Sequence, residues 1–252
     1  MLRDELESYL RDFLSVEDFT DYCPNGLQVE GKDEIRKIVT GVTASQKLID
    51  AAIEYQADAI IVHHGYFWKG EELPIVNMKK QRIKKLLDHD ISLFAYHLPL
   101  DAHPQLGNNI QLAGLLGLQE LKALEKIGKH DLGLVGKLKE PIQIQDFQTL
   151  CSSILGREIQ VFGPESRFIK TLGLCTGAAQ SMFERAVVEH DVDAYISGEI
   201  SEPSFHIAEE YQRNYFAIGH HASERYGVKA LGEHLAETFL LDCVFVDCVN
   251  PV

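Results

Sequence analysis

The stretch SQKLIDAAIEYQADAIIVHHG, residues 45–65, decides the fold. Apolar side chains recur at helical spacing over residues 45–55, and residues 58–65 form the continuous apolar run of a buried strand. This strand finishes on His63 and His64. Adjacent side chains on a strand point to opposite faces, so two neighbouring imidazoles are hard to pack unless something at the strand end needs both.

Strand and helix patterns alternate on both sides of this stretch. In the first half we expect strands at 35–43, 58–65 and 91–98 and helices at 2–14, 45–55, 77–89 and 108–117. In the second half we expect strands at 171–177, 192–199, 215–221 and 243–248 and helices at 179–190, 203–211 and 223–239, with extra strands at 132–138 and 159–164 around a helix at 144–155. This order predicts an α/β fold with mainly parallel or mixed sheets covered by helices.

The second half also repeats the first in sequence. Residues 45–65 align without a gap with residues 180–200, and 94–101 resembles 216–224 with one residue inserted. We therefore predict an internal duplication that gives two related α/β lobes, residues 1–125 and 126–252, divided near the charged stretch 121–131. The last strand can return to the first lobe. Ligands of open α/β sheets bind at the carboxyl ends of strands, so we expect a site in the cleft between the lobes.

Composition narrows the classes of protein. The chain has 252 residues, 45% of them apolar, and a net charge of −14. The acidic charge argues against extended nucleic-acid binding. No apolar run approaches the roughly 20 residues of a membrane span, and the acidic N-terminus does not resemble a signal peptide, so we expect a cytoplasmic protein without membrane contact. The five cysteines are scattered without a CxxC motif, which disfavours a thiolate zinc site.

Polar residues collect at the predicted carboxyl ends of strands. His63 and His64 end one strand, and His97 ends the next, with Asp101 four residues later. In the second lobe His220 ends a strand, and Glu224 follows after the same interval, in the first turn of a helix beginning near residue 223. Asp101 follows a proline, so we expect it in a loop. Imidazole and carboxylate ligands together suit zinc, manganese, iron or cobalt, and two such ions would form a hydrolytic centre.

Other residues near these strand ends have open roles. His97 is a metal ligand, an orienting partner of a ligand or an acid/base residue, and His221 is an orienting or structural residue. Glu199 matches His64 in the repeat and either acts as a base or caps the next helix. Residues 25–31 (NGLQVEG) read as a loop that lines a pocket or simply turns. The aromatic residues 66–68 either pack or stack on a planar base.

Several of these motifs together resemble one family. DYCPNGLQVEG, IIVHHGYFWKG, FAYHLPLDAHPQLGNN, DAYISGEIS and GHHASER occur in order over nearly the whole chain. The sequence resembles the NIF-three-like family of GTP cyclohydrolase 1 type 2 homologues, in its short bacterial form. The resemblance implies two α/β lobes, two divalent metal ions per subunit and a homo-oligomer built as a hexameric ring. The ligands that it implies are His63, His64, Asp101, His220 and Glu224.

These observations predict a dinuclear metal-dependent hydrolase. A metal-bound hydroxide would attack an anionic small molecule, and the resemblance implies a nucleotide as in GTP cyclohydrolase chemistry. Glu224, His97 and Glu199 are the candidates for moving protons. One alternative is a metal-dependent phosphoesterase. Another is a metal-binding interaction or regulatory protein without turnover, whose metal coordination would be closed rather than open.

Overall fold

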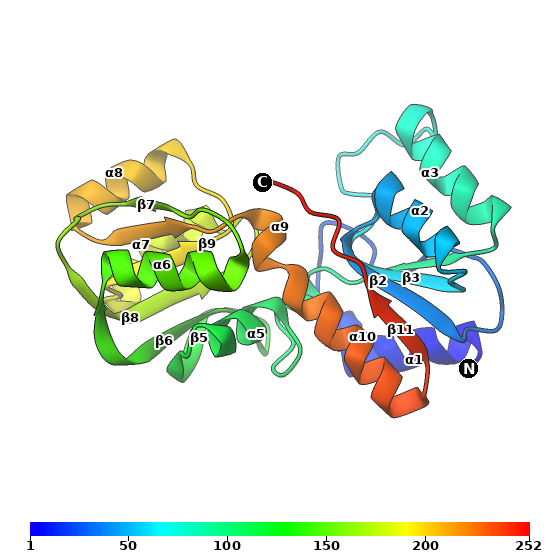
Figure 1. Ribbon diagram of the computed structural model, residues 1–252, viewed down its shortest axis with the longest axis horizontal. Helices are drawn as coiled ribbons and strands as arrows, with labels where there is room; N and C mark the ends of the chain where they lie inside the picture. The colour runs from blue at the N-terminus through cyan, green and yellow to red at the C-terminus, as the bar shows by residue number, and fades with distance from the viewer. The chain divides into compact units, whose positions relative to one another are not determined.

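The computed structural model describes residues 1–252 as two compact units (Figure 1). Unit 1 consists of Met1–Leu106 and Gly227–Val249, and unit 2 of Gly107–Tyr226 and Asn250–Val252. The chain thus first changes unit after Leu106, earlier than the charged stretch 121–131 at which we expected the boundary. None of the helices combines the length and the apolar character that a membrane span requires.

Unit 1 is built on a five-stranded sheet. Its strands are β1 (Gly26–Val29), β2 (Lys37–Thr43), β3 (Ala59–His64), β4 (Ser92–Ala95) and β11 (Asp242–Phe245). They lie in the order β1-β4-β3-β2-β11, in which all neighbours are parallel except the antiparallel edge strand β1. The last strand therefore returns to the first lobe, as the sequence allowed. Residues 26–29 form this edge strand, so the predicted loop at 25–31 was wrong.

Helices cover both faces of this sheet (Figure 1). They are α1 (Arg3–Phe13), α2 (Gln46–Glu54), α3 (Asn77–Asp88), the short α4 (Leu98–Asp101) and α10 (Arg225–Phe239), with a 3₁₀ turn η1 (Val16–Asp18) after α1. The side chains of β3 alternate between two cores. Ala59 and Ile61 pack with α1 and α10, whereas Ile60 and Val62 pack with α2 and α3. Burial on both faces explains the uninterrupted apolar run of this strand.

Unit 2 contains a six-stranded mixed sheet. Its strands are β5 (Gln119–Ile127), β6 (His130–Gln143), β7 (Gln160–Phe162), β8 (Phe168–Cys175), β9 (Ala194–Ser197) and β10 (Asn214–Ala217). The order is β5-β6-β8-β9-β10-β7, with β8, β9 and β10 parallel and the outer pairs antiparallel. The charged stretch 121–131 lies in the hairpin of β5 and β6. Its charged side chains fit the position of β5 at the edge of the sheet, because charges on an edge strand prevent pairing with other chains.

The helices of unit 2 also lie on two faces of its sheet. They are α5 (Asn108–Leu115), α6 (Ile144–Leu155), α7 (Phe183–His190), α8 (Glu202–Tyr211) and the short α9 (His220–Ser223), with a 3₁₀ turn η2 (Gln180–Met182) before α7. In β9, Ala194 and Ile196 pack in the core with α5 and α6, whereas Tyr195 packs with α7 and α8. The alternation is the same as in β3.

The duplicated strands share an anchor at their start. Asp58, just before β3, accepts hydrogen bonds from the backbone N–H groups of Arg36 and Lys37, both at 3.0 Å. Asp193, just before β9, accepts them from Lys170 and Thr171, at 3.0 and 2.9 Å. These donors occupy equivalent register positions, since Ile38 pairs with Ala59 as Leu172 pairs with Ala194. The two units are thus related at the level of individual hydrogen bonds.

Candidate metal centre

The unit 1 cluster begins at the end of β3. His63 is fully buried and His64 is partly exposed, and their ring centroids lie 4.5 Å apart. The two rings thus lie close together, although successive side chains of a strand point to opposite faces. The next residue, Gly65, has no room for a side chain, because a Cβ there would lie 2.2 Å from Oε1 of Gln28. Gln28 fixes this turn by accepting a 2.7 Å hydrogen bond from the Tyr66 N–H.

His63 has a defined tautomer. Its Nδ1 lies 3.0 Å from the backbone carbonyl of Tyr96, to which it must donate, so Nε2 carries the lone pair that a metal requires. This Nε2 lies 3.6 Å from Oδ2 of Asp101. Asp101 ends the short helix α4, which has a proline in its first turn, so the predicted loop was wrong. Proline is compatible with a first helical turn because the N–H groups there have no intrahelical partner.

His97 is held by a carboxylate that the sequence did not reveal. Its Nδ1 lies 2.8 Å from Oδ1 of Asp21, and its backbone N–H donates to Asn25 at 2.7 Å. Asp21 also accepts hydrogen bonds from the Leu98 N–H and from the Asn25 amide. Burial alone would raise the pKa of Asp21, but the contacts with His97 and Asn25 outweigh it and lower that pKa. A carboxylate on one imidazole nitrogen orients the other nitrogen toward a ligand.

The three imidazoles of unit 1 converge. Potential ligand atoms of His63, His64 and His97 all lie within 4.8 Å of one another. A second group of the same kind joins Asp21, Cys23 and His97. Burial, and to a smaller extent the Asp21 carboxylate, raises the pKa of the Cys23 thiol to about 12, so this residue stays a thiol at neutral pH. The imidazole cluster with Asp101 is therefore the better donor set for a divalent cation.

The unit 2 cluster is centred on His220. Strand β10 ends at Ala217 and this residue begins the four-residue helix α9, so it does not end a strand as we expected, and Glu224 lies between α9 and α10. His220 lies between two carboxylates, with Nδ1 2.7 Å from Oε1 of Glu199 and Nε2 3.1 Å from Oε2 of Glu224. Glu224 is almost completely buried. Helix α8 has Ser201 rather than Glu199 at its N-cap position.

The two carboxylates change the protonation of His220. Burial alone would lower its pKa, but the hydrogen bonds and charges of Glu224 and Glu199 outweigh burial and raise the pKa of His220 to about 9. The imidazole is therefore protonated at neutral pH in the absence of a competing cation. A divalent ion would replace this proton on Nε2 and meet the Glu224 carboxylate beside it. This donor set fits the type of metal that the sequence predicted.

Two glycines make room for the unit 2 cluster, and the sequence analysis missed both. Gly177 has a left-handed φ of +68°, and a Cβ there would lie 2.2 Å from Oε1 of Glu224. A Cβ on Gly198 would lie 2.7 Å from both the Gly177 carbonyl oxygen and the His220 Cα. Gly198 aligns with His63 in the repeat, so the alignment was the signal that could have found it.

The remaining candidates have structural contacts. His221 is buried, and its backbone N–H donates to the carbonyl of Val252. The Tyr66 hydroxyl donates to the carbonyl of Ala44 at 2.8 Å, so this ring is a packing residue. Phe67 is partly exposed beneath the ammonium group of Lys79, which lies 4.8 Å from the ring centroid.

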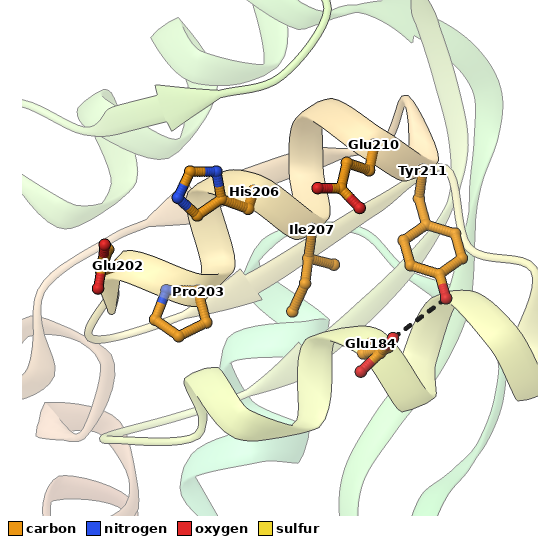
Figure 2. A pocket seen from close by; sticks show the side chains of 7 residues that line it. All are labelled: Glu184, Glu202, Pro203, His206, Ile207, Glu210 and Tyr211. Carbon is orange, nitrogen blue, oxygen red and sulfur yellow. Dashed lines mark hydrogen bonds between the residues drawn. The ribbon is translucent and has the colours of Figure 1, made fainter.

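A separate pocket lies between α7 and α8 (Figure 2). It has a volume of about 570 Å³ and is lined by Glu184, Glu202, Pro203, His206, Ile207, Glu210 and Tyr211. The Tyr211 hydroxyl donates to Glu184 across its edge at 3.1 Å. None of these residues is a predicted site residue. Three carboxylates in its lining make the pocket unsuitable for an anionic molecule.

The chain is similar to known proteins along almost its whole length. The model of the family Duf34/NIF3 (NGG1p interacting factor 3) matches residues 1–251. The chain belongs to the Duf34/NIF3 family. A Haemophilus influenzae member, named GTP cyclohydrolase 1 type 2 homolog, is 51% identical over 250 residues that cover 98% of both chains.

Solved structures with similar sequences have the same fold as this chain. One, described as protein ybgI of unknown function, has a TM-score of 0.94 at 46% identity and covers 100% of both chains. Another, the protein TTHA1606 from Thermus thermophilus, has a TM-score of 0.89 at 35% identity, also over 100% of both chains. Membership in Duf34/NIF3 therefore extends over both units, and the predicted resemblance is confirmed.

Proposed function

We propose that this Duf34/NIF3 protein is a metal-dependent hydrolase that acts on a nucleotide or another anionic small molecule. The observation that carries the proposal is the convergence of His63, His64 and His97, whose potential ligand atoms lie within 4.8 Å of one another. The three imidazoles lie at or just after the ends of β3 and β4. A divalent cation is the ligand that such a cluster of imidazole nitrogens accommodates. The relatives named GTP cyclohydrolase 1 type 2 homolog support hydrolytic chemistry on a nucleotide.

We assign two divalent ions to the protein, held by His63, His64 and Asp101 of unit 1 and by His220 and Glu224 of unit 2. When bound, such ions lower the pKa of a coordinated water and offset negative charge on a substrate. Five protein ligands for two ions leave coordination positions for water and substrate, which distinguishes a catalytic site from a closed structural one. The two ions offset the four carboxylates of these clusters, Asp21, Asp101, Glu199 and Glu224, and their open coordination positions bind the anionic groups of a substrate.

The chain's own residues supply the proton transfers in this proposal. His97 has Nδ1 occupied by Asp21, so Nε2 is the nitrogen that exchanges a proton with the substrate. Glu224 is the second proton carrier in the proposal, because its buried carboxylate lies 3.1 Å from Nε2 of His220, the nitrogen that we assign to a metal. Glu199 contacts the opposite nitrogen of His220 and orients that ring. Its role as a base is therefore less direct than the sequence suggested.

The test combines metal analysis with turnover. Metal content of the purified protein is measured by mass spectrometry, and hydrolysis is followed on a panel of nucleotides and phosphoesters, which also distinguishes ring opening from phosphoester cleavage. We expect about two ions per chain and a turnover that falls about 100-fold or more in Glu224→Gln. The matched control is Glu233→Gln, because the Glu233 side chain is 64% exposed on α10.

Two results would contradict the proposal. Turnover in Glu224→Gln equal to that of the wild type would remove Glu224 from the site. Stoichiometric metal binding without hydrolysis of any panel member would favour the alternative of a metal-binding interaction or regulatory protein. The homo-oligomer, the hexameric ring and the cytoplasmic location remain predictions that size-exclusion chromatography with light scattering and cell fractionation can test.

A further inference from the structure

The single tryptophan of the chain lies beside the imidazole cluster. The ring centroids of Trp68 and His97 are 5.0 Å apart, with the rings nearly perpendicular at 83°. The centroid of His64 lies 5.8 Å from that of Trp68. Trp68 is only partly buried, and it lies next to His64, which we assign to metal. No role in the proposed chemistry uses this ring.

Several contacts fix the orientation of the indole. Its Nε1–H donates to the Gly65 carbonyl at 3.2 Å, and its backbone N–H donates to Oε2 of Glu71 at 3.0 Å. Glu71 is held in turn by the ammonium group of Lys79 at 3.1 Å. The preceding residue, Phe67, has a left-handed φ of +66°, a conformation that a bulky non-glycine residue rarely adopts. Such strain persists where the surroundings enforce it, and it concentrates at ligand sites.

The neighbouring aromatic residues do not offer an equivalent surface. Tyr66 is buried, and its hydroxyl is bonded to the Ala44 carbonyl. The ring of Phe67 contacts the Lys79 ammonium group. Trp68 is thus the one aromatic side chain of this segment that is partly exposed, fixed in orientation and in contact with the imidazole cluster.

We propose that Trp68 is a substrate-contacting residue that packs against a flat heteroaromatic ring of the substrate. This inference rests on the proposed function and names its substrate class more narrowly. Metal ions bind the phosphate groups of any anionic substrate and do not distinguish one that carries a base from one that does not. Selection for a base needs an apolar planar surface at a fixed distance from the ions, and stacking on an aromatic side chain provides it.

The experiment compares two anions on the metal-loaded protein, GTP and inorganic triphosphate, which lacks the ring. Because the chain has one tryptophan, its intrinsic fluorescence reports on this position alone. We expect GTP to change the emission of the wild type and triphosphate to leave it nearly unchanged. By calorimetry, Trp68→Leu should weaken GTP binding about tenfold, while Trp68→Phe, which keeps a flat ring, should stay within about threefold. Triphosphate affinity should be the same in all three proteins.

The control variant is Phe168→Leu, which alters an aromatic residue that is 60% exposed on β8 and should leave GTP binding unchanged. Metal content is measured for every variant, and Trp68→Phe decides the case if Trp68→Leu loses metal. GTP affinity unaffected by either Trp68 variant, equal weakening of both anions, or no GTP binding to the wild type would overturn the inference. Ring-selective binding without hydrolysis would support it and contradict the proposed function alone, whereas hydrolysis independent of Trp68 would contradict this inference alone.

Discussion

The two units resemble each other where their central strands begin and differ where those strands end. Asp58 and Asp193 accept the same pair of backbone N–H groups at the start of β3 and β9. At the other end, His63 and His64 of unit 1 stand where unit 2 has Gly198 and Glu199. The two central strands thus share the hydrogen bonds at their start and carry different side chains at their ends.

The divergence also gives the two clusters different electrostatics. In unit 1, Nδ1 of His63 lies against a carbonyl and Nδ1 of His97 against a carboxylate. In unit 2, His220 lies between two carboxylates and keeps a proton at neutral pH. A cation that binds to His220 must therefore displace a proton.

The largest effect should come from filling the glycine position that corresponds to His63. Gly198→Ala places a methyl group 2.7 Å from two backbone atoms, neither of which is the end of a flexible side chain. We expect the free energy of unfolding to fall by about 3 kcal/mol, because the backbone of α9 must move. Urea denaturation of metal-free protein measures this. A loss below about 1 kcal/mol would show that the backbone around Gly198 can accommodate a side chain, as the backbone around His63 does.

A somewhat smaller loss of stability, equal in the two units, should come from removing Asp58 or Asp193. Asp58→Ala and Asp193→Ala each leave two backbone N–H groups without their carboxylate, and we expect each variant to lose about 2 kcal/mol of unfolding free energy. Metal content should not change in either. Calorimetric melting of the two variants side by side gives the comparison. If the two losses of unfolding free energy differ by more than a factor of two, the two aspartates share the same hydrogen-bond geometry but do not contribute equally to stability.

The next effect in size should be a loss of metal affinity when a carboxylate that orients a histidine is removed. Glu199→Gln removes the charge beside Nδ1 of His220, and Asp21→Asn does the same for His97. We expect Glu199→Gln to weaken metal binding about tenfold, since partners of this kind contribute 10- to 100-fold. Competition with a chelating dye measures the affinity. Unchanged affinity in Glu199→Gln, with a loss in Asp21→Asn, would locate the metals in unit 1 alone.

The raised pKa of His220 predicts a pH dependence of stability in unit 2. The ordinary pKa of histidine is 6.5, and that of folded His220 is raised to about 9. In metal-free protein its contribution to stability is therefore complete below pH 6.5 and is lost as the pH rises through about 9. Metal affinity has the opposite slope, because fewer protons compete as the pH rises. Urea denaturation at about pH 6.5 and about pH 9.5, with Glu199→Gln as the control that lacks one carboxylate, tests this difference.

Local sequence patterns predicted the parts of the molecule that depend on burial. The helix expected at 144–155 has those bounds in the structure, and the strands expected at 58–65 and 215–221 are found as β3 and β10, although β10 already ends at Ala217. These predictions depend on the apolar pattern that burial imposes. The edge strand β5 was not predicted, because charged side chains interrupt its apolar pattern and the stretch was taken as the boundary between the lobes.

The candidate site was predicted only in part, because only some of its residues stand out in a local sequence pattern. His63, His64 and His220 were visible because polar residues interrupt apolar runs at strand ends. Asp21 lies 76 residues before His97, in a segment without periodicity, so nothing local associated the two. The two glycines beside Glu224 and His220 were missed because their role is to leave space, and only coordinates show which neighbouring atoms need it.

The route of the chain through unit 1 has a consequence for synthesis. Strand β11 pairs with β2, and helix α10 fills the core beneath it with residues such as Leu231 and Leu235. These elements leave the ribosome long after the strands that they contact. Unit 2 has its sheet and helices available before them, although it begins later in the chain. Until then, the part of the apolar face that α10 covers stays exposed in the N-terminal segment of unit 1, and transiently exposed apolar surface favours aggregation.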